Sequence, residues 1–154
     1  MQKQDRTPSP VARVLLTTAG EDAPPPRRTA LVIDDTGCHR HIAISLLKRL
    51  GFDVEQAIDG LQGLEMMIEK RFDVVFCDYE MPGLDGFACV SELRQWEHDH
   101  RPHHQKQPVV CFTASLQQQS GIAAQGLEAG MDMVVPKPYS RGKLETALEQ
   151  VQML

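Results

Sequence analysis

Residues Phe72 to Gly86 have the sequence FDVVFCDYEMPGLDG, and this stretch decides the fold. Its apolar run, VVFC, is short and bounded by turn residues, which indicates a strand buried on both faces. The run ends at a carboxylate, Asp78, and the proline and glycines that follow predict a loop. Asp78 is then either an acid that caps a turn or, at the carboxyl end of a buried parallel strand, part of a ligand site.

On both sides of this stretch, short apolar runs alternate with segments whose apolar residues have helical spacing. Strands are predicted at 30–33, 53–57, 73–78, 109–113 and 131–135. Helices are predicted at about 37–50, 61–71, 85–96 and 116–129, followed by a last helix with an apolar stripe of Leu144, Leu148 and Val151. Ile42 and Leu61 are expected on the inner faces of the first two helices, Gly51 is expected to end the first, and Asp85 to cap the third.

Regular alternation of strands and helices is typical of a parallel sheet with helices on both faces and right-handed crossovers. The fold class is therefore predicted to be α/β, a doubly wound (βα)5 sheet. Its length fits the flavodoxin-like strand order 2-1-3-4-5, in which the ligand crevice lies beside the first and third strands.

The chain has 154 residues, which fits one domain and a tail. Residues 1–28 contain TPSP and PPPRR, which predict a disordered or linker-like tail, and 29–154 form the predicted domain. The net charge of −5 argues against a nucleic-acid partner, because that requires a basic surface. No apolar run approaches the roughly 18 residues of a membrane span, and no convincing signal peptide is present, so a cytoplasmic location is expected.

The four cysteines are scattered and form no CxxC pair, so neither a zinc ribbon nor a thioredoxin-type site is supported. Each lies in an apolar part of the sequence. All four are therefore expected to be reduced core residues: Cys38, Cys77, Cys89 and Cys111.

Polar residues that could bind a ligand or take part in catalysis follow four of the five predicted strands. They are Asp34 and Asp35 after the first, Asp78 after the third, Thr113 at the end of the fourth and Lys137 after the fifth. In the predicted topology all five converge on one crevice. Singly they are ordinary residues, a strand threonine or a solvated lysine for example, but their joint placement is specific.

Clustered carboxylates repel one another, and a hard divalent cation relieves that repulsion. Mg²⁺ prefers a few carboxylates together with water and phosphate oxygens, so the cluster suits phosphoryl transfer. Asp78 would be the nucleophile and become an acyl phosphate. Lys137 would supply a positive charge and the Thr113 hydroxyl a hydrogen bond to the phosphoryl oxygens.

The segment 29–154 resembles the receiver domain of two-component response regulators, the CheY-like fold. The matching motifs are LVIDD at 31–35, DYEMPGLDG at 78–86, FTA at 112–114 and KP at 137–138. The amino-acid sequence around residues 81–86 is most similar to that of receivers of hybrid histidine kinases. As a receiver, the chain would be a phosphoacceptor and not an enzyme. Phosphorylation would switch a face that binds other proteins. The downstream effector protein is unknown.

The resemblance implies that Asp78 accepts a phosphoryl group from a phosphohistidine of a sensor histidine kinase or a histidine phosphotransfer protein. It further implies that Asp35 and Asp78 bind Mg²⁺ directly, that Asp34 acts through water and that the backbone carbonyl of Glu80 completes the site. Ala114 would have to be small to leave room for phosphoryl oxygens. Glu80 and Ser115 also flank the site and would tune hydrolysis.

Two features depart from the family pattern. Many receivers carry an aromatic residue three positions before the lysine, and here that residue is Val134, so a readout by an aromatic side chain that turns inward is in doubt. The predicted link from Glu97 to Pro108 is long and carries His98, His100, His103 and His104. It is either a solvated loop or a transition-metal site, since imidazole is a common ligand.

Two alternative functions use the same residues. A haloacid-dehalogenase-type phosphohydrolase combines an aspartate with Mg²⁺, but it requires Asp-x-Asp after the first strand, whereas Asp34 and Asp35 are adjacent. A degenerate receiver would keep the fold and act only as a protein-binding scaffold. Phosphoryl transfer to Asp78 distinguishes this scaffold from an active receiver.

Overall fold

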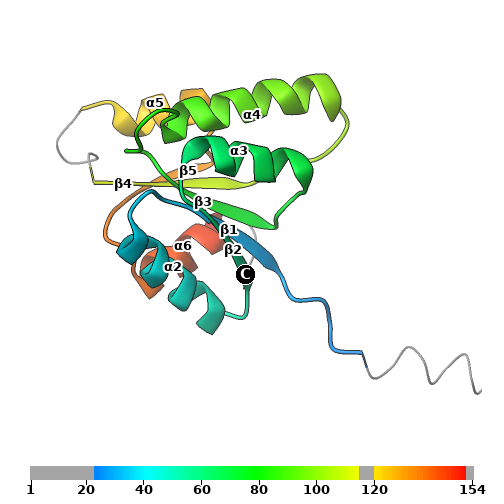
Figure 1. The fold of residues 1–154 in the computed structure, drawn as a ribbon, viewed down its shortest axis with the longest axis vertical. Coiled ribbons are helices and arrows are strands. Elements are labelled where there is room, and N and C mark those ends of the chain that lie inside the picture. Colours follow the sequence, from blue (N-terminus) through cyan, green and yellow to red (C-terminus); the bar gives the residue numbers. More distant parts are fainter. Residues whose placement is uncertain (1–22, 115–119, 152–154) are drawn as a thin grey trace, which may run out of the picture.

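The computed structural model describes residues 23–114 and 120–151. Most of the predicted tail, residues 1–22, therefore lies outside the described part, while 23–28 contain no helix or strand. Strands and helices alternate along the chain (Figure 1) as β1 (Thr29–Ile33), α2 (Gly37–Arg49), β2 (Asp53–Ala57), α3 (Gly60–Glu69), β3 (Val74–Asp78), α4 (Gly86–His100), β4 (Val109–Thr113), α5 (Ile122–Ala129), β5 (Met133–Pro136) and α6 (Arg141–Gln150).

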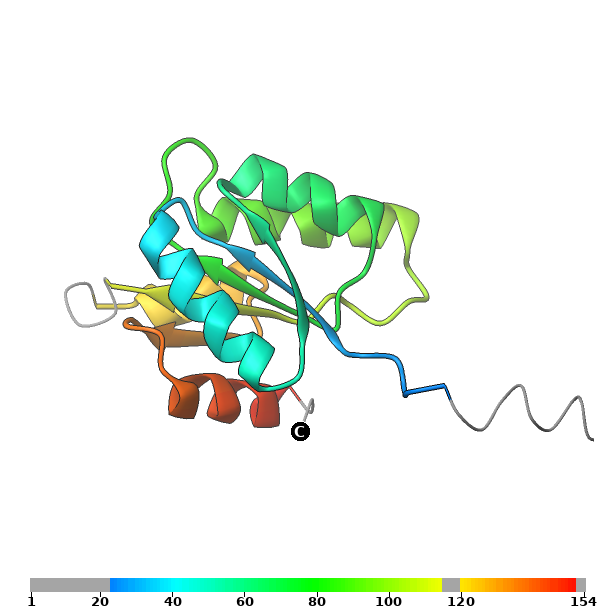
Figure 2. The same ribbon diagram turned by 60° about the horizontal axis from the view of Figure 1, so that its bottom comes forward.

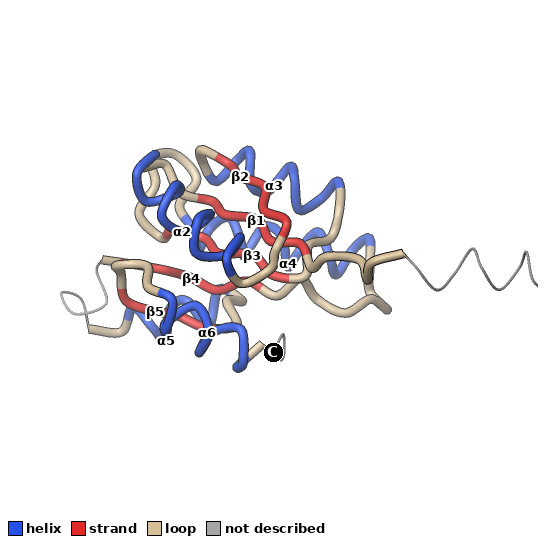
Figure 3. The backbone as a smooth tube through the Cα atoms, turned by 90° about the horizontal axis from the view of Figure 1, so that it is seen from below, coloured by secondary structure: helices blue, strands red, loops and turns tan. Residues whose placement is uncertain are grey.

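The five strands form one parallel sheet in the order β2-β1-β3-β4-β5, which confirms the predicted topology. Figure 3 shows this order across the molecule, with β2 and β5 at the two edges. Helices α3, α4 and α5 cover one face and α2 and α6 cover the other (Figures 1 and 2). Because β1 lies between β2 and β3, the connections after β1 and β3 leave on opposite faces of the sheet, which opens a crevice at their carboxyl ends.

Successive residues of the central strands enter two core layers, one on each face of the sheet. In β1, Leu31 and Ile33 pack with α3 and α4, while Ala30 and Val32 pack with α2 and α6, and all four are fully buried. Strand β3 is buried along its whole length in the same way. Each fully buried aliphatic or aromatic side chain contributes about 1.5–3 kcal/mol, so these apolar runs provide much of the stability of the fold.

Helices α3, α4 and α6 begin at an Asp or Ser side chain that caps them, as expected for these residues at such positions. Asp85 accepts a hydrogen bond of 2.8 Å from the Ala88 backbone N–H at the start of α4, which confirms its predicted role. Asp59 caps α3 in the same way. Gly51 follows the end of α2 with a φ of 90°, a conformation that favours glycine.

Some predicted faces and boundaries were wrong. Ile42 and Leu61 are 47% and 58% exposed, so neither lies on the inner face of its helix. Residues 116–119 of the predicted fourth helix lie outside the described part, and α5 begins only at Ile122. Strand β5 begins at Met133, two residues later than predicted. The preceding Asp132 donates its N–H to the Val109 carbonyl and accepts the Val109 N–H on its carboxylate.

Two further expectations need correction. Cys38 is exposed on α2, so only the other three cysteines are buried core residues; all four are free thiols. Helix α4 continues to His100, which places His98 and His100 in a helix and leaves a shorter link to β4. In the ranges that the structure describes, no helix is both long enough and apolar enough to cross a membrane.

Candidate functional site

Three carboxylates meet where β1 and β3 end. Asp34 and Asp35 directly follow β1, and Asp78 is the last residue of its neighbour β3. One oxygen from each lies within 4.8 Å of the others. Asp34 is fully buried and Asp78 is 2% exposed, whereas Asp35 faces solvent. The topology alone brings these side chains together, because the carboxyl ends of paired parallel strands share one edge.

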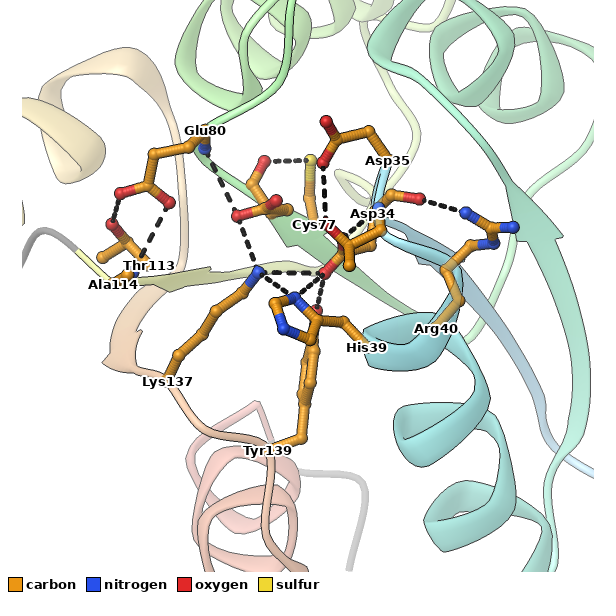
Figure 4. Close-up of polar contacts among 12 residues, drawn as sticks. Asp34, Asp35, His39, Arg40, Cys77, Glu80, Thr113, Ala114, Lys137 and Tyr139 are labelled. Atoms are coloured by element: carbon orange, nitrogen blue, oxygen red, sulfur yellow. Dashed lines mark hydrogen bonds and ion pairs between the residues drawn. The ribbon is translucent and has the colours of Figure 1, made fainter.

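Lys137 links the two buried carboxylates from the loop after β5. Its Nζ lies 3.1 Å from Oδ2 of Asp34 and 3.2 Å from Oδ1 of Asp78. It also lies 3.0 Å from Nδ1 of His39 on α2, so the lysine contacts groups from three different elements (Figure 4). The side chain of Lys137 is 11% exposed, which strengthens these charge interactions relative to a surface pair.

The charges of the site shift the pKa values of its members. Burial raises the pKa of Asp78, the Asp34 carboxylate raises it too, and Lys137 lowers it, so that the net pKa is about 7. Burial lowers the pKa of Lys137, but the Asp78 and Asp34 carboxylates outweigh it and raise this pKa overall. The lysine is therefore charged at neutral pH. Its single positive charge does not balance the three carboxylates, which still repel one another.

The carboxylates differ in how far protein donors already satisfy them. Asp34 accepts the Thr36 backbone N–H on Oδ1 at 2.9 Å, and both Lys137 and the Tyr139 hydroxyl on Oδ2 at 3.1 Å. Asp35 has one long contact of 3.5 Å from the Thr36 hydroxyl. An all-oxygen, partly solvated set of three carboxylates fits a hard cation such as Mg²⁺.

Thr113 ends β4 and is buried, and its hydroxyl donates a hydrogen bond of 2.5 Å to Oε1 of Glu80. The other Glu80 oxygen accepts the Ala114 backbone N–H at 3.4 Å, and the Glu80 backbone N–H donates to Oδ1 of Asp78 at 3.3 Å. Glu80 thus bridges the ends of β3 and β4 (Figure 4) through its side chain and its N–H, contacts that sequence reasoning missed. Ser115 lies outside the described residues.

Sequence reasoning also missed Tyr139, His39 and Arg40. The Tyr139 hydroxyl bonds Asp34, His39 contacts Lys137, and Arg40 donates to the Asp34 backbone carbonyl at 2.8 Å. The sequence carried a weak signal for them: Tyr139 follows Lys137 by two residues, and the other two fall in the first turns of the helix after Asp35. A side chain that ends in a polar group and lies near a predicted site in the sequence should therefore be considered as a candidate member of that site.

The structure places the two features that depart from the family pattern, Val134 and the histidines at 98–104. Val134 is half-buried and packs in the core layer that includes Phe87, with a methyl close to Gly126. Among the described residues, the only group of three or more His, Cys, Asp or Glu side chains near enough to share a metal is Asp34, Asp35 and Asp78. The histidines around 98–104 do not form such a group, so the structure does not support the transition-metal alternative.

Comparisons with known proteins agree with this geometry. Residues 30–149 match the family model described as response regulator receiver domain. Over 151 residues, 96% of this chain, the sequence is 28% identical to the peroxide stress-activated histidine kinase mak2 of Schizosaccharomyces pombe, but spans only 6% of that protein. It is 32% identical over 122 residues to chemotaxis protein CheY-3 of Vibrio cholerae, covering 79% of this chain and 88% of CheY-3.

One solved structure bears on the carboxylate cluster. The receiver domain of the sensor histidine kinase PA1611 from Pseudomonas aeruginosa was crystallised with a magnesium ion coordinated in its active site cleft. It is 25% identical in sequence, with a TM-score of 0.69, and the match covers 82% of this chain and 99% of that one.

Proposed function

The chain belongs to the response regulator receiver family, and we propose that Asp78 is the residue on which it accepts a phosphoryl group. One observation carries the proposal: the Lys137 ammonium lies within 3.2 Å of carboxylate oxygens on both Asp34 and Asp78. A cation held between the ends of β1 and β3 is placed to offset the charge that a phosphoryl group would bring. Thr113 ends the neighbouring strand β4 and offers a hydroxyl from the other side.

The proposed step is an exchange of one bond to phosphorus for another. An Asp78 carboxylate oxygen attacks the phosphorus of a phosphohistidine, an O–P bond forms and the P–N bond breaks, so the imidazole leaves and Asp78 becomes an acyl phosphate. Lys137 stabilises the negative phosphoryl oxygens by charge and Thr113 by a hydrogen bond. Thr113 must exchange its bond to Glu80 for one to the phosphoryl group, which would couple the modification to the segment after β4.

We further propose a Mg²⁺ site at the same place. Asp35 and Asp78 would hold the ion directly, Asp34 would act through water because both of its oxygens already accept protein donors, and the Glu80 backbone carbonyl would complete the set. The donor chemistry and the magnesium in the PA1611 receiver support this proposal. When bound, Mg²⁺ neutralises charge on the transferring phosphoryl group.

The phosphoryl donor is proposed to be a sensor histidine kinase or a histidine phosphotransfer protein in the cytoplasm. Support comes from the histidine kinases among the relatives, of which this chain matches a small part. Within the chain, 29–154 would be the receiver domain and 1–28 a linker or tail.

Incubation with acetyl phosphate and Mg²⁺ tests the proposal directly. We expect an acid-stable, base-labile adduct of about 80 Da by intact mass spectrometry. Asp78→Asn should abolish it, while Asp99→Asn, which changes an exposed carboxylate at the end of α4, should not. No adduct at saturating donor would instead favour the degenerate receiver that acts only as a binding scaffold. The phosphohydrolase alternative is set aside, because the chain belongs to a family of phosphoacceptor modules.

A further inference from the structure

The Tyr139 side chain is built into the site beneath Asp34. Its hydroxyl donates to Oδ2 of Asp34 at 3.1 Å, and its ring packs on Phe112 with the ring centres 4.5 Å apart. The residue is 7% exposed and belongs to the core layer under α2 and α6. The ring is therefore fixed by packing, and its hydroxyl is held where Asp34 needs a donor (Figure 4).

Asp34 shares one oxygen between two donors that behave differently. Lys137 is a flexible cation that also reaches Asp78, whereas the Tyr139 hydroxyl is fixed and reaches Asp34. Oδ1 of Asp78 lies 3.2 Å from the ammonium, so the negative charge of a phosphoryl group on Asp78 would draw Lys137 away from Asp34. A fully buried carboxylate that loses its cation is destabilised unless another donor remains.

We infer that Tyr139 is a positioning residue for phosphorylation: its hydroxyl keeps Asp34 oriented and satisfied when Lys137 turns to the phosphoryl group. The inference rests on the metal and phosphoryl site proposed above. Tyr139 does not touch the reacting atoms; it acts through the carboxylate that would hold a metal-bound water. Groups that support metal-binding side chains in this way commonly change metal affinity by about 10-fold or more when removed.

Tyr139→Phe tests this, because it deletes the hydroxyl and leaves the ring packing. We expect the Kd for Mg²⁺, measured by isothermal titration calorimetry, to rise about 10-fold. The rate of adduct formation from acetyl phosphate should fall at subsaturating Mg²⁺. The matched control is Tyr79→Phe, which alters the other tyrosine, stacked on Phe87, and should leave both values unchanged.

A double-mutant cycle separates this role from simple packing. Lys137→Met removes the ammonium and imitates its departure from Asp34. In that background, among the described residues, Tyr139 is the side-chain donor that remains within hydrogen-bond distance of Oδ2, with Nδ1 of His39 farther away at 3.8 Å. Tyr139→Phe should therefore raise the Kd for Mg²⁺ by a larger factor than in the wild type. A purely structural hydroxyl would change the unfolding midpoint and give the same factor in both backgrounds.

The outcomes distinguish this inference from the proposed function. If the wild type neither binds Mg²⁺ nor forms the adduct, the proposed site fails. If the wild type does both but Tyr139→Phe leaves the Kd for Mg²⁺ unchanged or lower, or the two factors are equal, the inference about Tyr139 is overturned. Circular dichroism of each variant establishes that the fold is retained before the comparison is made.

Discussion

The Thr113 hydroxyl and the Glu80 carboxylate are joined by a hydrogen bond of 2.5 Å across the ends of β4 and β3. The same Glu80 bonds the next backbone N–H, of Ala114, and through its own N–H contacts Asp78. Thr113 is therefore engaged with an acidic side chain before any phosphoryl group arrives. In the proposed reaction, a phosphoryl group on Asp78 would have to compete with Glu80 for this hydroxyl, so Glu80 would oppose the switch both by charge and by hydrogen bonding.

Glu80→Ala should therefore be phosphorylated faster than the wild type. The substitution removes a negative charge from the approach of an anionic donor and removes the bond from the Thr113 hydroxyl to Glu80, and we expect a rate increase of about twofold to tenfold. The measurement is the time course of adduct formation from acetyl phosphate by intact mass. Glu69→Ala, at an exposed position at the end of α3, is the control. A slower reaction of Glu80→Ala than of this control would contradict the competition.

The raised pKa of Asp78 predicts an unusual pH dependence of stability in the absence of Mg²⁺. Its pKa rises from 3.8 to about 7 on folding, chiefly through burial, so between these pH values the folded state binds a proton that the unfolded state releases. The stability contributed by Asp78 is therefore complete below about pH 4 and is lost as the pH rises towards 7, by on the order of 1 kcal/mol per pH unit.

This pH dependence is measured by urea unfolding of the wild type and Asp78→Asn across pH 4–8, with EDTA or with Mg²⁺. In EDTA, the free energy of unfolding of the wild type minus that of Asp78→Asn should fall as the pH rises. Mg²⁺ should flatten the trend, because the cation replaces the proton. A constant difference in EDTA would mean that Asp78 ionises at its ordinary pKa.

Lys137→Met should destabilise the metal-free protein at neutral pH by about 3–5 kcal/mol, because Asp34 and Asp78 would remain buried without their cation. Saturating Mg²⁺ should recover part of this loss. Lys106→Met, at an exposed lysine before β4, is the matched control and should change the free energy of unfolding by less than about 0.5 kcal/mol. Equal effects of the two substitutions would show that Lys137 does not stabilise the buried carboxylates.

Gly86→Ala tests how closely the start of α4 packs against the end of β3. A Cβ at Gly86 would lie 2.3 Å from the Asp78 backbone carbonyl oxygen, so the start of α4 has to move away from the phosphoacceptor strand. We expect a loss of about 1–3 kcal/mol and slower phosphorylation. Gly142→Ala, in α6 with no atom within 4 Å of the new Cβ, should instead stabilise by about 0.5–1 kcal/mol. Thermal and urea unfolding of the pair measure the contrast.

The sequence by itself determined the strands, their order and the edge at which the acids, Thr113 and Lys137 gather. Buried parallel strands are nearly continuous apolar runs, and their ends are marked in the sequence by the first polar residue. Once the order is fixed, residues after β1, β3, β4 and β5 must share one edge, and this follows from topology without knowledge of any side-chain conformation.

Only the tertiary structure decided which side chains at that edge touch. His39 enters the site from α2 and Tyr139 from the loop between β5 and α6, and packing on the sheet sets both positions. The rotation of α2 and α3 on the sheet leaves Ile42 and Leu61 exposed despite their helical spacing. The bond from Thr113 to Glu80 likewise depends on the end of β4 and the loop after β3 meeting within 2.5 Å. Periodicity in a sequence specifies an element and its approximate face, whereas contacts between elements arise from the mutual fit of side chains that are distant along the chain.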